Sequence, residues 1–143
     1  MKNAFFLLFG LLLFASCQDQ LQTDIDLIEE FLADNNIDAE RDESGLYYAI
    51  DVEGAGDSPT INDEVTVNYR GTLLEDGTPF DSGNNVTFPL TGVIRGWQIG
   101  IPKLRAGGSG TLYIPSELAY GTRQVGVIPP NSVLIFEVDL LDF

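Results

Sequence analysis

The N-terminal end of the chain is largely apolar. Lys2 precedes a twelve-residue apolar run from Ala4 to Ala15, and a serine and Cys17 follow it. A helix that crosses a membrane needs ~20 apolar residues, so this run is too short to cross one. A charged start, a short apolar segment and small residues at its end are typical of a secretory signal. The pattern therefore predicts a signal peptide over residues 1–16 rather than a buried core helix.

A helical pattern follows the apolar run. Thr23 or Asp24 can cap a helix that continues to about Asn35, while residues 18–22 are expected to form a tether. An amphipathic strut against the rest of the protein is favoured over a spacer or a dimer contact, so residues 17–44 form one tether-and-helix segment. The apolar positions of this helix are spaced three, three and one residues apart: Ile25, Ile28, Phe31 and Leu32.

From Gly45 onward, short β-type runs are separated by Gly, Pro, Asn and Asp. A short helix is expected near Arg95–Leu104, limited by Pro102. Strands interrupted by one short helix, without βαβ alternation, predict an α+β fold with a helix packed on an antiparallel sheet. The expected strands are Leu46–Val52, Glu64–Leu74, Thr87–Leu90, Gly110–Ile114 and Val133–Asp142.

Composition narrows the possible chemistry. The chain has no histidine and one cysteine, which excludes His-based catalytic dyads and zinc sites built on His or paired Cys. A net charge of −15, from 7 basic and 22 acidic residues, argues against nucleic acid as a partner. Most of the acidic excess lies between Gln18 and Asp57, where 13 acidic residues accompany one arginine. The remaining chain is only mildly acidic.

No hydrolytic or metal-binding set stands out. The paired carboxylates lie in the acidic segment, where solvation is their usual role. The glycine cluster at residues 107–110 is expected to form a tight turn, because no Gly-Lys-Ser/Thr follows it. The other candidate functional residues are aromatic and apolar side chains next to expected loops. They are compatible with either a hydrophobic core or a binding pocket.

Six motifs from this group resemble the FKBP-type peptidyl-prolyl cis-trans isomerases, in order and close to the family's spacing. The resemblance covers residues 45–143, and it implies a strongly bent antiparallel half-barrel sheet that wraps a short helix. The motifs are Val67-Asn68-Tyr69-Arg70-Gly71, Asp76-Gly77, Phe80-Asp81-Ser82, Val93-Ile94-Arg95-Gly96-Trp97, Ala119-Tyr120-Gly121 and Ile128-Pro129-Pro130.

The resemblance also implies a cleft that binds the proline of an extended peptide. Trp97 is expected to form its floor, and the Ile94 N–H and Tyr120 hydroxyl to donate hydrogen bonds to ligand carbonyls. Asp81 is expected to be the one carboxylate in the cleft, oriented by the Tyr69 hydroxyl. The walls implied are Tyr69, Phe80, Val93, Ile94 and Phe136, with Tyr120 and Ile128 at the rim.

Such a cleft needs no cofactor or metal. Rotation about a peptide bond faces a barrier of ~18–20 kcal/mol from amide resonance. A dry apolar pocket disfavours the planar, charge-separated amide relative to its twisted transition state. The resemblance therefore implies an isomerase that acts on proline-containing segments of exported proteins. A non-catalytic peptide-binding chaperone or recruiter, and a structural lipoprotein, are the alternatives.

The chain departs from the family pattern in two loops. Residues 82–88 are shorter than in many members and lack the Arg that often pairs with the cleft aspartate, and an aromatic wall position falls on Val86. The loop at residues 121–126 is one residue short, and the rim His of some members is absent. These changes bear on substrate preference and inhibitor affinity more than on activity.

The residues Leu13-Phe14-Ala15-Ser16-Cys17 resemble the bacterial lipobox, in which the cysteine is lipidated. The resemblance implies that Cys17 carries the lipid and anchors an exported protein to a bacterial membrane, at its periplasmic face or in the outer membrane. Several acyl chains on one residue anchor a protein firmly, whereas single chains bind marginally. A monomer is favoured.

Overall fold

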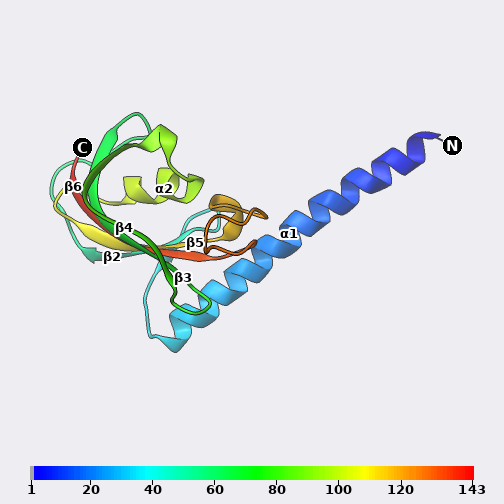
Figure 1. The fold of residues 1–143 in the computed structure, drawn as a ribbon, viewed down its shortest axis with the longest axis horizontal. Coiled ribbons are helices and arrows are strands. Elements are labelled where there is room, and N and C mark those ends of the chain that lie inside the picture. Colours follow the sequence, from blue (N-terminus) through cyan, green and yellow to red (C-terminus); the bar gives the residue numbers. More distant parts are fainter. Residues whose placement is uncertain (1) are drawn as a thin grey trace.

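An antiparallel sheet forms most of the domain (Figure 1). Along two of its strands, residues 64–73 and 134–142, buried side chains alternate with more exposed ones. The computed structural model describes the backbone of residues 2–143 and the side chains of residues 18–143. Within this part, the strands pair antiparallel in the order β1-β2-β5-β6-β3-β4. The strands are β1 Glu40–Arg41, β2 Tyr47–Val52, β3 Glu64–Leu73, β4 Pro79–Pro89, β5 Ser109–Ile114 and β6 Leu134–Asp142.

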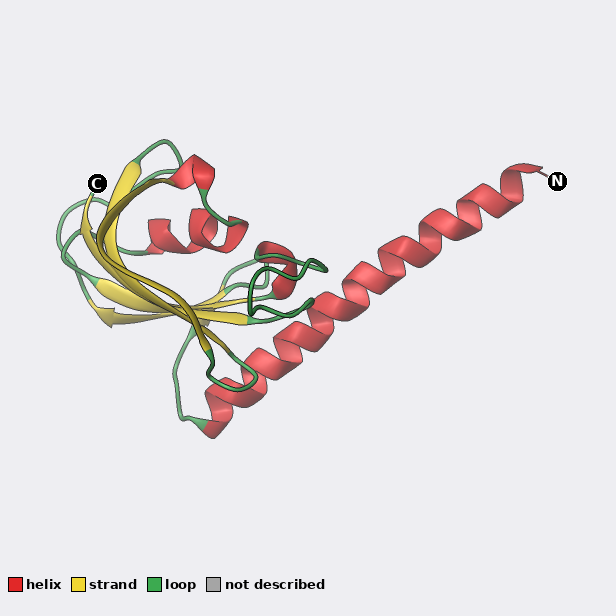
Figure 2. Cartoon of the chain, in the orientation of Figure 1, coloured by secondary structure: helices red, strands yellow, loops and turns green. Residues whose placement is uncertain are grey.

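The sheet curves around the short helix α2 (Arg95–Gly100), as Figure 2 shows. A 3₁₀ turn, Ile101–Lys103, continues α2 and accommodates Pro102 near its start, where a missing N–H costs no helical bond. Trp97, Ile101 and Leu104 are buried against the sheet, as their helical spacing predicts. The expected α+β fold, with a bent sheet wrapping one short helix, is therefore confirmed.

The opposite face of the sheet is covered by the long helix α1 (Lys2–Asp34) (Figure 1). Alternation along β5 decides which layer each residue joins: Leu112 and Ile114 face α2, whereas Tyr113 faces α1. The sheet is thus the middle of three layers, and α1 packs on it as a strut. The α1 side of this contact consists of Ile25, Ile28 and Leu32, all buried.

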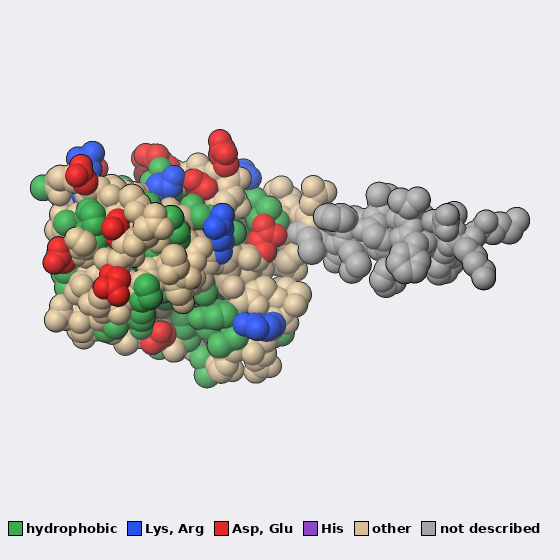
Figure 3. Space-filling model, turned by 90° about the horizontal axis from the view of Figure 1, so that it is seen from above, with side chains coloured by type: hydrophobic (Ala, Val, Ile, Leu, Met, Phe, Trp, Pro, Cys, Tyr) green, Lys and Arg blue, Asp and Glu red, His purple; other side chains and the backbone are tan. Residues whose placement is uncertain are grey.

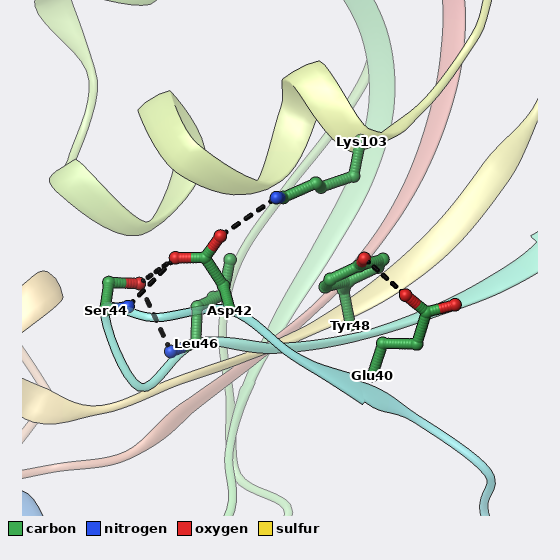
Figure 4. A network of polar contacts seen from close by, with 6 residues as sticks. All are labelled: Glu40, Asp42, Ser44, Leu46, Tyr48 and Lys103. Atoms are coloured by element: carbon green, nitrogen blue, oxygen red, sulfur yellow. Dashed lines mark hydrogen bonds and ion pairs between the residues drawn. The ribbon is translucent and has the colours of Figure 1, made fainter.

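Two further contacts tie the N-terminal segment to the domain. The Tyr47 hydroxyl donates to Glu29 of α1 at 2.5 Å. Beyond the helix, Lys103 pairs with Asp42 at 2.9 Å, and Ser44 donates to the same carboxylate through both its hydroxyl and its N–H (Figure 4). The segment before the domain is therefore bound to the sheet and to the turn that follows α2.

The predicted start of α1 is wrong. Residues 18–22, expected to be a tether, are helical, because no Gly or Pro interrupts the chain between residues 11 and 44. Thr23 donates to the Asp19 carbonyl within the helix instead of capping its start. The end agrees with the prediction: the helix stops at Asp34, and Asn36 adopts φ 53°. The side chains of the expected signal peptide and of Cys17 lie outside the described residues.

The strand predictions are confirmed within one residue except at β4. This strand begins at Pro79 rather than Thr87, and β1 has no counterpart among the predictions. Both are edge strands, and most of their side chains are exposed on either face. β1 has no buried face and so carries no period-two signal, and in β4 only the end from Val86 onward alternates apolar and polar side chains. The glycine cluster does form a turn, with Gly107 at φ 78°.

Candidate active site

A cavity of about 300 Å³ opens between α2 and the concave face of the sheet. Its residues come from β3, β4, β6, the start of α2 and the loop after β5. Most of the surrounding side chains are aromatic or branched apolar groups, and one carboxylate is present. The lining residues are Tyr69, Asp81, Phe88, Gly92, Val93, Ile94, Trp97, Tyr120 and Phe136.

Trp97 lies in the middle of this aromatic group and is 4% exposed. Its ring is met edge-on by three others: Tyr69 at 5.2 Å and 85°, Phe88 at 5.7 Å and 90°, and Phe136 at 5.3 Å and 85°. Edge-to-face pairs at such distances stabilise the arrangement beyond simple burial. The indole is therefore held in one orientation from three sides.

The backbone at the start of α2 fixes the position of Trp97. The Trp97 and Gln98 N–H groups both donate to the Ile94 carbonyl, and the Gln98 side chain donates to the Val93 carbonyl at 3.3 Å. These bonds hold Val93 and Ile94 at the cavity mouth. The Trp97 Nε1–H is buried and has no hydrogen-bond partner among the described residues.

The carboxylate of Asp81 is oriented by Tyr69, whose hydroxyl donates to Oδ2 at 2.9 Å. Burial, reinforced by this hydrogen bond, raises the pKa of Tyr69 to about 12, so the hydroxyl stays protonated and able to donate. β4 carries one extra residue opposite Asn68, which makes a bulge in β4, and Asn68 accepts a hydrogen bond from the Asn85 N–H there. The expected contact between Tyr69 and Asp81 is thus present.

Seven of the nine residues expected in the cleft line this cavity. Phe80 lines a separate shallow depression on the other side of Asp81, and its ring packs edge-on against Phe136 at 5.4 Å. Ile128 is 4% exposed and belongs to the hydrophobic core. Phe80 therefore supports a wall from behind, and Ile128 supports the loop that carries Tyr120.

Phe88 was not expected in the cleft. Phe88 lines the cavity, whereas Val86, on which the family's aromatic wall position falls, is not among the lining residues. Val86 and Phe88 pair with Val67 and Val65, both fully buried, so the two residues share the inner face of β4. Their period-two spacing was the available signal.

A second cavity, of about 410 Å³, lies between α1 and the turn after β3. It is larger, but it lacks the ring cluster and the oriented carboxylate of the first. Acidic and basic side chains are interspersed on the face of the molecule in Figure 3, without a single-sign patch that marks a site. Among the described residues, no group of three or more carboxylates or cysteines is placed to hold a metal ion. The aromatic cavity is therefore the candidate site.

Comparisons with known proteins agree with this geometry. Residues 56–141 match the family model for the FKBP-type peptidyl-prolyl cis-trans isomerases. The chain is 48% identical over 103 residues both to peptidyl-prolyl cis-trans isomerase Mip of Coxiella burnetii and to FkpA of Escherichia coli K12. The match covers 68% and 69% of this chain, but only 44% and 38% of those relatives, so the chain spans less than half of their length.

Solved structures extend the similarity beyond the matched domain. The crystal structure of FkpA from Escherichia coli superposes with a TM-score of 0.74 at 36% identity, covering 99% of this chain and 70% of that one. AtFKBP13 gives a TM-score of 0.67 at 36% identity, over 73% of this chain and 98% of its own. The matched family model, the shared fold and the aromatic cleft together establish that this chain belongs to the FKBP-type peptidyl-prolyl cis-trans isomerase family.

Proposed function

We propose that this protein catalyses cis-trans isomerisation of X-Pro peptide bonds in exported polypeptides. The observation that carries the proposal is the cavity floored by Trp97 and walled by Tyr69, Phe88 and Phe136. Its volume and its apolar lining suit a proline ring and exclude water from the adjoining amide. Uncatalysed cis-trans isomerisation of an X-Pro bond takes tens to hundreds of seconds.

Catalysis follows from the difference between a planar and a twisted amide. The planar form carries separated charge through resonance, and a dry aromatic cavity solvates it poorly. The twisted form loses that separation, so the cavity favours the transition state over the ground state. No nucleophile, general base or cofactor is required, which suits a chain without histidine.

Polar groups at the mouth complete the mechanism. Ile94 and Tyr120 line the cavity, and we expect the Ile94 N–H and the Tyr120 hydroxyl to donate to carbonyls flanking the proline. Asp81, the one carboxylate that lines the cavity, is held by the Tyr69 hydroxyl and carries a negative charge. In the described residues no Arg or Lys forms an ion pair with Asp81, so this charge is not neutralised by an internal cation.

A protease-coupled assay on a short proline peptide tests the proposal, using the full chain in a non-ionic detergent. We expect rate acceleration, a large loss in Trp97→Ala and Phe80→Ala, and a smaller loss in Asp81→Asn. Leu141→Ala, which changes an exposed side chain outside the cavity, is the control. Peptide binding without acceleration would replace the proposal with a peptide-binding chaperone or recruiter. Wild-type rates in all cleft variants would show that the cleft is misplaced.

We further propose that Cys17 carries a lipid that anchors the protein to a bacterial membrane. The lipobox resemblance of Leu13–Cys17 supports this assignment. Among the described residues, no helix is both long enough and apolar enough to span a membrane. Labelling with a radioactive fatty acid should give incorporation in the wild type and none in Cys17→Ala. Equal incorporation in both would overturn the proposal.

A further inference from the structure

One carboxylate outside the cleft is completely buried. Asp24, on α1, has no exposed surface, and its Oδ2 accepts hydrogen bonds from the Ser116 N–H at 2.8 Å and the Ser116 hydroxyl at 2.5 Å. Its other oxygen accepts from the Gln20 side chain at 2.8 Å. Burial of a carboxylate is costly unless hydrogen bonds satisfy it, so these donors account for its presence.

Other contacts also dock α1 on the sheet. The helix buries Ile25 and Ile28, and Glu29 accepts a separate hydrogen bond from Tyr47. An apolar residue at position 24 would avoid desolvation of a charge, but it would leave the Ser116 N–H and hydroxyl without their acceptor. The placement of Asp24 therefore serves Ser116 itself.

Ser116 accepts backbone hydrogen bonds from the residues on both sides of Tyr120. It begins the 3₁₀ turn η3 (Ser116–Leu118), and its carbonyl accepts the N–H of Ala119 at 3.0 Å and of Gly121 at 2.8 Å. These two residues flank Tyr120, which lines the aromatic cavity. A chain of hydrogen bonds thus runs from α1 through every polar backbone atom of Ser116 to the rim of the cleft.

We propose that Asp24 is a positioning residue for isomerisation, which it serves by holding Tyr120 at the mouth of the cleft through Ser116. This inference rests on the proposed function. The N-terminal helix then belongs to the working site, although Asp24 is outside the residues that match the family model. Loss of the carboxylate leaves both Ser116 donors buried without a partner, so the loop must move to hydrate them.

Three variants of the full chain separate positioning from docking. Asp24→Ala removes both acceptors, and we expect kcat/KM for a proline peptide to fall about tenfold through displacement of a binding group. Asp24→Asn keeps one oxygen facing Ser116 while Gln20 rotates its amide, so it should recover most of the rate. Glu29→Ala, the matched control on the same helix, removes the bond to Tyr47 and should keep wild-type kcat/KM.

The dependence on Tyr120 is tested in a Tyr120→Ala background. There, Asp24→Ala should lower kcat/KM by less than about twofold, since coupled residues do not add independently. NMR signals of the Tyr120 ring should shift in Asp24→Ala and stay unchanged in Glu29→Ala. A wild-type rate and an unshifted ring in folded Asp24→Ala would overturn the inference. An equal tenfold loss in Glu29→Ala, or with Tyr120 absent, would overturn it as well.

Failure of the proposed function has a different signature. A wild-type chain without isomerase activity refutes the function, and the ring signals of Tyr120 then decide the positioning claim alone. A peptide that binds without turnover can replace the substrate in this measurement. Its affinity should fall about tenfold in Asp24→Ala for the same geometric reason.

Discussion

A single methyl group added at Gly71 should damage the cleft from within the sheet. Gly71 lies near the C-terminal end of β3, between the rings of Phe80 and Phe136. A Cβ at this position would lie 2.6 Å from Phe80 Cζ and 2.8 Å from Phe136 Cε1, well inside the 3.4 Å at which ordinary contact begins. Gly71→Ala therefore forces one or both rings to move.

The magnitude follows from two opposing effects. Overpacking in a filled core costs ~1–3 kcal/mol, whereas alanine in a strand interior is favoured over glycine by ~0.5–1 kcal/mol. The expected net loss of unfolding free energy is about 0–2.5 kcal/mol. Because Phe136 is a cleft wall that touches Trp97, displacement of its ring should lower kcat/KM by about 10- to 100-fold.

Urea unfolding followed by fluorescence measures the stability, since Trp97 is the only tryptophan of the chain. The proline-peptide assay measures the rate. Gly71→Ala combined with Phe80→Leu should recover stability, because the second change removes the closest ring atom. A Gly71→Ala protein with unchanged midpoint and rate would refute the packing argument. A double variant less stable than Gly71→Ala would show that the clash with Phe80 is not the cause.

Two pH dependences are expected from the contacts of the N-terminal segment. Hydrogen bonds from Ser44, together with Lys103, lower the pKa of Asp42 from 3.8 to about 2. The ionised carboxylate therefore stabilises the fold above pH 3.8, and this stabilisation is lost as the pH falls toward 2. Asp42→Asn should flatten the pH dependence of unfolding free energy in that range; an unchanged slope would contradict this. Burial, with the hydrogen bond to Glu29, raises the pKa of Tyr47 from 10.0 to about 12. The protonated hydroxyl therefore contributes its full stabilisation of the fold below pH 10, and this stabilisation is lost as the pH rises to 12. Tyr47→Phe should remove part of the alkaline loss seen by circular dichroism, and an identical alkaline transition would exclude this cause.

The strands with one buried face could be predicted from the sequence. In β3, Val65 and Val67 are fully buried between more exposed neighbours, and β6 alternates in the same way. The edge strand β4 could not be predicted along its whole length, since the part-buried residues of its first half, Phe80 and Gly83, are three positions apart rather than two. The start of α1 was misjudged because capping residues also occur inside helices, where Thr23 bonds back to the preceding turn.

The cleft was predictable as far as the motifs placed residues in order along the chain. Side-chain direction was not, and it decides the three differences. Phe80 packs edge-on against Phe136 without lining the cavity, and Ile128 is buried in the core. Phe88 reaches Trp97 from the inner face of β4. The partnership of Asp24 with Ser116, 92 positions apart, has no local signature at all. Only tertiary packing brings these two residues together.

The position of β6 sets the order in which this protein can fold. The strand is the last along the chain, yet it lies in the interior of the sheet, paired with β5 on one side and β3 on the other. Until residues 134–142 have been synthesised, the facing edges of β3 and β5 have no partner, and the sheet remains two unjoined halves. Closing contacts between distant segments is slow and leaves unpaired edges open to other chains. The cleft wall that Phe136 supplies is therefore complete only when β6 has joined the two halves of the sheet.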